Sequence, residues 1–132
     1  MPDADTLLQM MPFAAECGVS IASATADRVE GRMEWQPTRC TAGGVLHGGA
    51  LMTLADTLGA VCAFLNLPAG AGTSTIESKT NFFRPIRSGP AVATTVPLHV
   101  GRTTIVLQTD IRDESGRRAT QTTQTQAVIQ TP

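Results

Sequence analysis

The sequence has little net charge and no long run of charge of one sign. Ten basic and eleven acidic residues give a formal net charge of −1 over 132 residues, which argues against a nucleic-acid partner. Its three cysteines, Cys17, Cys40 and Cys62, are odd in number and lack metal-ligand spacing. They fit a reducing compartment better than a disulfide framework, and we expect no metal site. No basic region followed by an apolar run begins the chain, so we expect no signal peptide and a cytoplasmic location.

No internal repeat and no linker-like segment divides the chain. A length of 132 residues suits one domain with a substantial core, and we expect a single domain over residues 1–132.

The most distinctive stretch is apolar or small almost throughout and covers residues 46–65, with Asp56 as its only charged residue. It is long enough to cross a membrane. Asp56, the paired Gly48 and Gly49, and the lack of flanking basic anchors favour a buried helix and no membrane partner. An isolated carboxylate in a buried helix is costly, so Asp56 needs a polar partner or a chemical role.

The start of this helix offers a second functional feature. The first N–H groups of a helix have no partners within the helix and carry partial positive charge. At Gly48 and Gly49 a ligand could approach those groups closely, so the helix start suits an anion or a polarised carbonyl oxygen. Small and polar residues recur at helical spacing and predict one narrow stripe along the helix: Gly49, Thr53, Asp56, Thr57 and Ala60.

The rest of the chain reads as one short helix, ended by Gly18, and six strands. The strands are expected at 19–24, 28–35, 73–83, 91–100, 103–112 and 119–129. Short turns join most of them, which predicts an antiparallel sheet packed on one helix in an α+β architecture. Simple alternation in 73–83 places Thr75 on the opposite face from Ser78 and Thr80. Pro97 predicts a sheet edge or a bulge.

Three motifs together resemble the hotdog-fold acyl-CoA thioesterases: Leu46-His47-Gly48-Gly49, then Ala55-Asp56-Thr57, then Asn81-Phe82-Phe83-Arg84-Pro85. The likeness is closest to the phenylacetate-pathway type within the 4-hydroxybenzoyl-CoA thioesterase superfamily. It implies a hotdog fold, in which a curved antiparallel sheet of five to six strands wraps one long central helix. It also implies hydrolysis of a small or medium acyl-CoA, aromatic ones included, to free acid and CoA. No cofactor is implied, because CoA enters as part of the substrate.

The resemblance also assigns roles to individual residues. It makes Asp56 the nucleophile or the general base. The Gly48 N–H polarises the thioester carbonyl, and His47 orients the loop. The hydroxyl that helps to position water falls on Thr75 when counted back from Arg84, or on Ser74 when counted forward from Asp56.

Three further residues are candidates for substrate binding. Gly49 flanks the carbonyl site, and Arg84 could meet the CoA phosphates. Related enzymes often carry Asn or Gln six residues before the histidine, and here that position is Thr41.

The spacing of Gly48 and Asp56 predicts an active site shared between two chains. They are eight residues apart, or ~12 Å along one helix at ~1.5 Å per residue. The Gly48 N–H and the Asp56 carboxylate of the same helix cannot easily contact one thioester group. Two antiparallel helices in a two-fold dimer would solve this, and the resemblance implies the same dimer, often paired into tetramers.

Other readings remain open from the residues alone. Asp56 could bridge neighbours structurally, His47 could simply cap the helix, and Gly48 and Gly49 could permit a tight turn. An acyl-thioester hydratase or dehydratase is one alternative function, although the chain has only His47 and His99 and lacks that branch's histidine motif. A non-catalytic acyl-CoA-binding module is another, although no helix-turn-helix pattern accompanies it.

Overall fold

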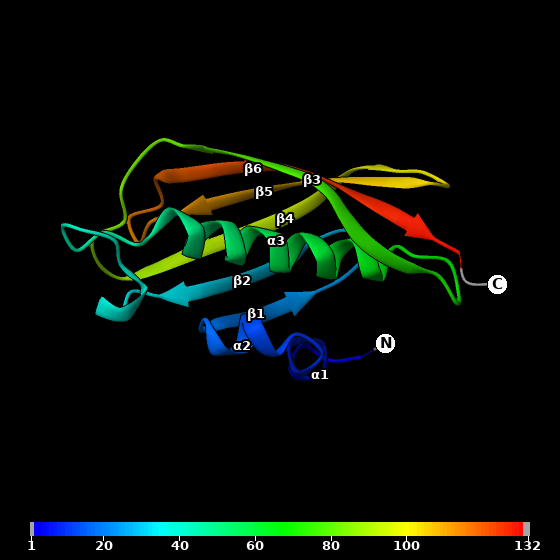
Figure 1. The fold of residues 1–132 in the computed structure, drawn as a ribbon, viewed down its shortest axis with the longest axis horizontal. Coiled ribbons are helices and arrows are strands. Elements are labelled where there is room, and N and C mark those ends of the chain that lie inside the picture. The colour runs from blue at the N-terminus through cyan, green and yellow to red at the C-terminus, as the bar shows by residue number, and fades with distance from the viewer. Residues whose placement is uncertain (1, 131–132) are drawn as a thin grey trace.

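The computed structural model describes residues 2–130 and shows one six-stranded antiparallel sheet with a long helix, α3, lying across one face (Figure 1). The strand order is β1-β2-β4-β5-β6-β3. The strands are β1 Val19–Ala24, β2 Val29–Glu34, β3 Gly72–Phe82, β4 Pro90–Val100, β5 Thr104–Arg112 and β6 Arg118–Ile129. The predicted α+β architecture and its six strands are confirmed. Every strand begins and ends within one residue of its predicted position.

Two short helices, α1 Ala4–Gln9 and α2 Pro12–Glu16, precede β1, so the prediction of one short helix was wrong. Proline has no backbone N–H to donate and disfavours a helical conformation in the residue before it, so a helix ends before Pro12 and a new one starts there. Asp3 caps α1 by accepting a hydrogen bond from the Thr6 N–H at 2.8 Å.

Helix α3 spans Gly48–Leu65 and forms the centre of the core. Leu54 and Leu58 are fully buried against the sheet, together with Met33 of β2 and Leu107 of β5. By length and composition α3 could cross a membrane, yet half of it is buried inside this structure. Before α3, the 3₁₀ turn η1 Pro37–Arg39 leads into a loop, and the Trp35 indole N–H donates to the Gly44 carbonyl at 3.0 Å.

Four of the strand pairings contain a register shift, and two of these shifts bear on the predictions. The β4–β5 register shifts between Pro97 and His99, which confirms the expectation from Pro97. The β3–β6 register shifts between Thr75 and Glu77, so that Ile76 is the extra residue. The simple alternation predicted for β3 was therefore wrong, because one extra residue reverses the phase of every side chain beyond it. Thr75 lies on the helix side of the sheet, the same side as Thr80, which contacts the buried Thr122.

Candidate active site

Asp56 lies at the border of the contact between α3 and the sheet, where its side chain is exposed and also reaches residues of β3 and β6. The expectation that its carboxylate is buried was wrong for the single chain, because Asp56 is exposed. Its Oδ1 accepts a hydrogen bond from Gln124 Nε2 at 2.7 Å and lies 3.1 Å from the Thr75 hydroxyl. Within residues 2–130, Oδ2 has no hydrogen-bond or ion-pair partner. One carboxylate oxygen is therefore held by the protein and the other is available to a substrate or a water molecule.

A surface hollow of about 310 Å³ lies at this carboxylate and is lined by Met52, Thr53, Asp56, Thr75 and Ser78. Along α3, the predicted stripe holds for Gly49, Thr53, Asp56 and Ala60, which are all at least partly exposed. It was wrong for Thr57, which is buried and donates its hydroxyl to the Thr53 carbonyl at 2.6 Å. Asp56 thus has the small Thr53 and Ala60 as neighbours on its own helix, and an open side.

The amides of Gln124 and Gln126 on β6 complete the site, and sequence analysis missed both. Each is only 1% exposed. Gln126 Oε1 accepts from Gln124 Nε2 at 2.8 Å and lies 2.6 Å from the Thr75 hydroxyl, whose single proton can be donated to Gln126 or to Asp56. Gln126 Nε2 donates to the Thr73 hydroxyl at 3.1 Å. A connected polar cluster beneath Asp56 therefore joins α3 to β3 and β6.

A signal for these amides was present in β6. Its alternate residues Thr120, Thr122, Gln124 and Gln126 are all polar, and all face the interior. A strand whose inward face is polar must satisfy those groups with partners. The row of polar residues on the inward face of β6 could have indicated an ionisable group on the helix that packs against that face.

His47 is the N-cap of α3. Its Nδ1 accepts a hydrogen bond from the Gly49 N–H at 2.8 Å, so this nitrogen carries no proton in the structure. A Cβ at residue 49 would lie 2.9 Å from Nδ1, which explains why glycine stands there. The His47 N–H donates to the Arg39 carbonyl at 2.9 Å. His47 thus orients the start of the helix, and its Nδ1 is not free to act as a base.

The Gly48 N–H is the free donor at the helix start. Within residues 2–130 it has no hydrogen-bond partner, and a Cβ at residue 48 would lie 3.3 Å from the Phe82 ring. A second hollow, of about 580 Å³, opens beside it and is lined by residues that include Phe13, His47, Gly49 and Thr53. Thr53 lines both hollows. A free backbone N–H and a carboxylate therefore lie along the exposed part of α3, about two turns apart.

The structure does not bring Thr41 or Ser74 to Asp56. Thr41 is exposed in the loop before α3, where its N–H donates to the Val45 carbonyl at 2.9 Å. Ser74 is adjacent to Thr75 in β3 and points to the opposite face of the sheet. Of the two candidate hydroxyl residues, Thr75 is the one at the carboxylate.

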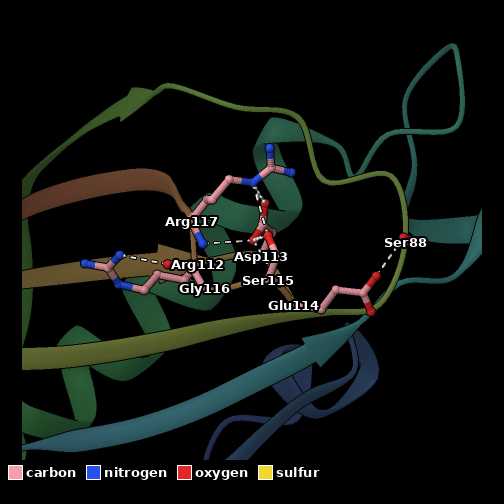
Figure 2. A network of polar contacts seen from close by, with 7 residues as sticks. All are labelled: Ser88, Arg112, Asp113, Glu114, Ser115, Gly116 and Arg117. Carbon is pink, nitrogen blue, oxygen red and sulfur yellow. Dashed lines mark hydrogen bonds and ion pairs between the residues drawn. The ribbon is translucent and has the colours of Figure 1, made fainter.

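Arg84 lines a different hollow, of about 300 Å³, next to the turn between β5 and β6. Figure 2 shows that turn, in which Asp113 accepts hydrogen bonds from the Ser115 hydroxyl at 2.7 Å and the Arg117 N–H at 2.9 Å. These contacts lower the pKa of Asp113 to about 2. Arg84 and Arg87 have no ion-pair partner within residues 2–130, so their guanidinium groups are available to an anion.

The matches to known proteins agree with this fold. Residues 43–120, more than half of the chain, match the model of the thioesterase superfamily. The chain is 37% identical over 75 residues to the proofreading thioesterase EntH of Klebsiella pneumoniae, and 34% identical over 86 residues to the 1,4-dihydroxy-2-naphthoyl-CoA hydrolase of Escherichia coli. The matched segments cover 57% and 65% of this chain, and 55% and 63% of those relatives.

The structural similarity extends over nearly the whole chain. A crystal structure of a thioesterase from Haemophilus influenzae superposes with a TM-score of 0.92 and 30% identity, covering 98% of this chain and 92% of the other. The chain therefore belongs to the thioesterase superfamily, whose fold places it in the class of thioester hydrolases.

Proposed function

We propose that this protein hydrolyses acyl-CoA thioesters to the free acid and CoA, with Asp56 as the reacting carboxylate. The observation that carries the proposal is the asymmetry of Asp56, whose Oδ1 is held by Gln124 and whose Oδ2 faces an open hollow. If Oδ2 attacks the thioester carbon, the carbon–sulfur bond breaks to give an acyl-aspartyl anhydride and CoA thiolate, and water then hydrolyses the anhydride to the free acid and the aspartate. If Oδ2 instead takes a proton from water as the water attacks the carbon, the carbon–sulfur bond breaks directly to give the free acid. In both routes a proton from the water passes to the leaving sulfur, so CoA is released as the thiol.

A backbone donor is needed for the carbonyl oxygen, and we assign it to Gly48. Charge develops on that oxygen as the carbon is attacked, and a preorganised N–H stabilises it. Because Gly48 and Asp56 are ~12 Å apart along α3, we assign the donor for each Asp56 to a second copy of the chain. Each two-fold dimer would then contain two shared sites.

The edge of the sheet supports this dimer. Strand β3 lies at one end of the strand order, and among residues 2–130 its one partner strand is β6. A long unpaired edge is a surface to which another strand can add. Apolar groups are exposed around it, with Ile76 60% exposed and Phe82 50% exposed. A second copy at β3 would cover these groups and bring two α3 helices together.

An apolar hollow of about 260 Å³ supports a small or medium acyl group, aromatic ones included. It is lined by residues that include Met10, Ala60 and Phe64. Ala60 follows Asp56 by one helical turn, so the acyl group could extend from the reacting carboxylate along α3. The free guanidinium groups of Arg84 and Arg87 suit the CoA phosphates.

The substitution Asp56→Asn tests the proposed role of Asp56. It keeps shape and hydrogen bonding and removes the charge, so turnover should fall by about 10²- to 10⁴-fold. Thiol release would be measured over a panel of acyl-CoAs of different lengths. The matched control is Glu77→Gln on the outward face of β3, where the Glu77 carboxylate accepts a hydrogen bond from the Thr125 hydroxyl at 3.1 Å. Wild-type turnover by Asp56→Asn would contradict the assignment.

A further inference from the structure

We propose that Gln124 is a positioning residue that fixes the orientation of the Asp56 carboxylate, and that Gly59 exists as glycine to admit the Gln124 amide. This role rests on the proposed function, because it concerns how Asp56 is held for catalysis. Gln124 itself is 1% exposed and does not reach the open hollow. It would act on the reaction only through Asp56.

The contacts define which end of each group faces the other. Gln124 Nε2 donates one hydrogen to Asp56 Oδ1 at 2.7 Å and the other to Gln126 Oε1 at 2.8 Å. Two acceptors on the same side fix the amide with its nitrogen toward Asp56. A carboxylate held by one oxygen cannot rotate freely, so Oδ2 is directed to the hollow.

Gly59 supplies the space for this amide. A Cβ at residue 59 would overlap Gln124 Oε1 and lie 2.7 Å from its Cδ. Gly59 lies in the middle of α3, where glycine is less favourable than alanine. The helix thus carries an unfavourable residue at the one place where the amide passes.

Stability alone does not account for this arrangement. Gln124 Oε1 is buried and has no hydrogen-bond partner among the described residues. A buried acceptor without a partner disfavours folding, and an apolar group of the same shape would avoid that loss. Asp56 is exposed and could be solvated without Gln124. The amide therefore has an unsatisfied oxygen and a nitrogen directed at the reacting carboxylate.

The test compares Gln124→Met with Thr122→Val. Methionine keeps the volume of glutamine and removes both donors. Thr122 is a buried neighbour on the same strand face, and its hydroxyl contacts Thr80 instead of Asp56. We expect Gln124→Met to lower kcat by about 10- to 100-fold, the scale of a hydrogen bond to a charged group. KM should stay within about threefold and Tm within about 3 °C. Thr122→Val should keep the wild-type kcat.

A double-mutant cycle with Gly59→Ala perturbs the same Gln124 amide through a substitution on α3. It tests the inference independently of the Gln124→Met variant. Gly59→Ala should displace the amide and lower kcat to a similar extent. In the Gln124→Ala background the new methyl group has room, so adding Gly59→Ala should change kcat by less than about twofold. Additive losses in kcat would overturn the inference.

The outcomes separate this inference from the proposed function. Loss of turnover in Asp56→Asn together with wild-type kcat in Gln124→Met would overturn the role of Gln124 alone. Parallel loss of kcat and Tm in Gln124→Met would show a structural residue and would also overturn it. Wild-type turnover in Asp56→Asn would instead overturn the proposed function.

Discussion

Two variants that are each inactive alone can test whether Gly48 and Asp56 act across a subunit boundary. The variants are Gly48→Val and Asp56→Ala. Gly48 does not have a positive φ, so its backbone admits a valine. The valine Cβ would lie 3.3 Å from the Phe82 ring, which is half exposed and can yield. Crowding at the Gly48 N–H, rather than loss of the fold, should then be the main effect.

The expected magnitudes follow from the roles proposed for the two groups. Loss of the carboxylate should reduce turnover by about 10²- to 10⁴-fold. Loss of one oxyanion donor should reduce it by about 10²- to 10³-fold. When equal amounts exchange at random, about half of the dimers are mixed, and each mixed dimer has one intact site out of two. Activity should therefore recover to about a quarter of the wild-type value.

The assay is thiol release after subunit exchange, with native mass spectrometry on distinguishable chains to verify the mixed dimer. Each variant exchanged with itself is the control and should stay inactive. If mixed dimers form and activity does not recover, or if a monomer has full activity, the shared site is refuted. The carbonyl oxygen would then have to be bound by a donor from the same chain as the reacting Asp56.

Two further predictions concern ionisable groups outside the site. Hydrogen bonds, led by that of the Ser115 hydroxyl, lower the pKa of Asp113 to about 2. The ionised Asp113 carboxylate therefore stabilises the fold at pH values above its ordinary pKa, and this contribution is lost as the pH falls through about 2. Asp113→Asn should lower Tm at pH 7, and its Tm should approach the wild-type value near pH 2. A Tm difference that stays constant with pH would contradict this. Burial raises the pKa of the Cys62 thiol to about 11. At pH 8 this thiol should therefore react with a disulfide reagent at least about tenfold more slowly than the thiols of Cys17 and Cys40. Equal rates in the folded protein would contradict this.

The fold could be predicted because its two periodicities are visible along the chain. The apolar run at 46–65 has one charge, and the strands alternate between turns rich in glycine and proline. Asp56 was harder, because its neighbours in sequence are apolar and suggested burial. The packing of the whole sheet decides which side of a helix stays exposed. The order of residues within one helix does not show which side that is.

The candidate site was predicted for residues on α3 and, as one of two candidates, for Thr75 on β3, and it was missed for the two amides on β6. The positions of Gly48 and Asp56 follow from helical spacing alone. Gln124 is 68 residues from Asp56, and no local pattern connects them. Thr75 could not be told apart from Ser74 by counting, because a bulge adds one residue between the two reference motifs and has no dependable sequence signal.

The bulge at Ile76 also has a consequence for changes in chain length. On either side of it the ladder continues without a gap in β6, with Thr75 opposite Gln126 and Glu77 opposite Thr125. A chain lacking residue 76 could therefore keep every other pair of this ladder. Deletions inside a strand usually turn the following side chains to the wrong face. Position 76 is the point in β3 where one residue can be removed while Thr75 stays beside Asp56.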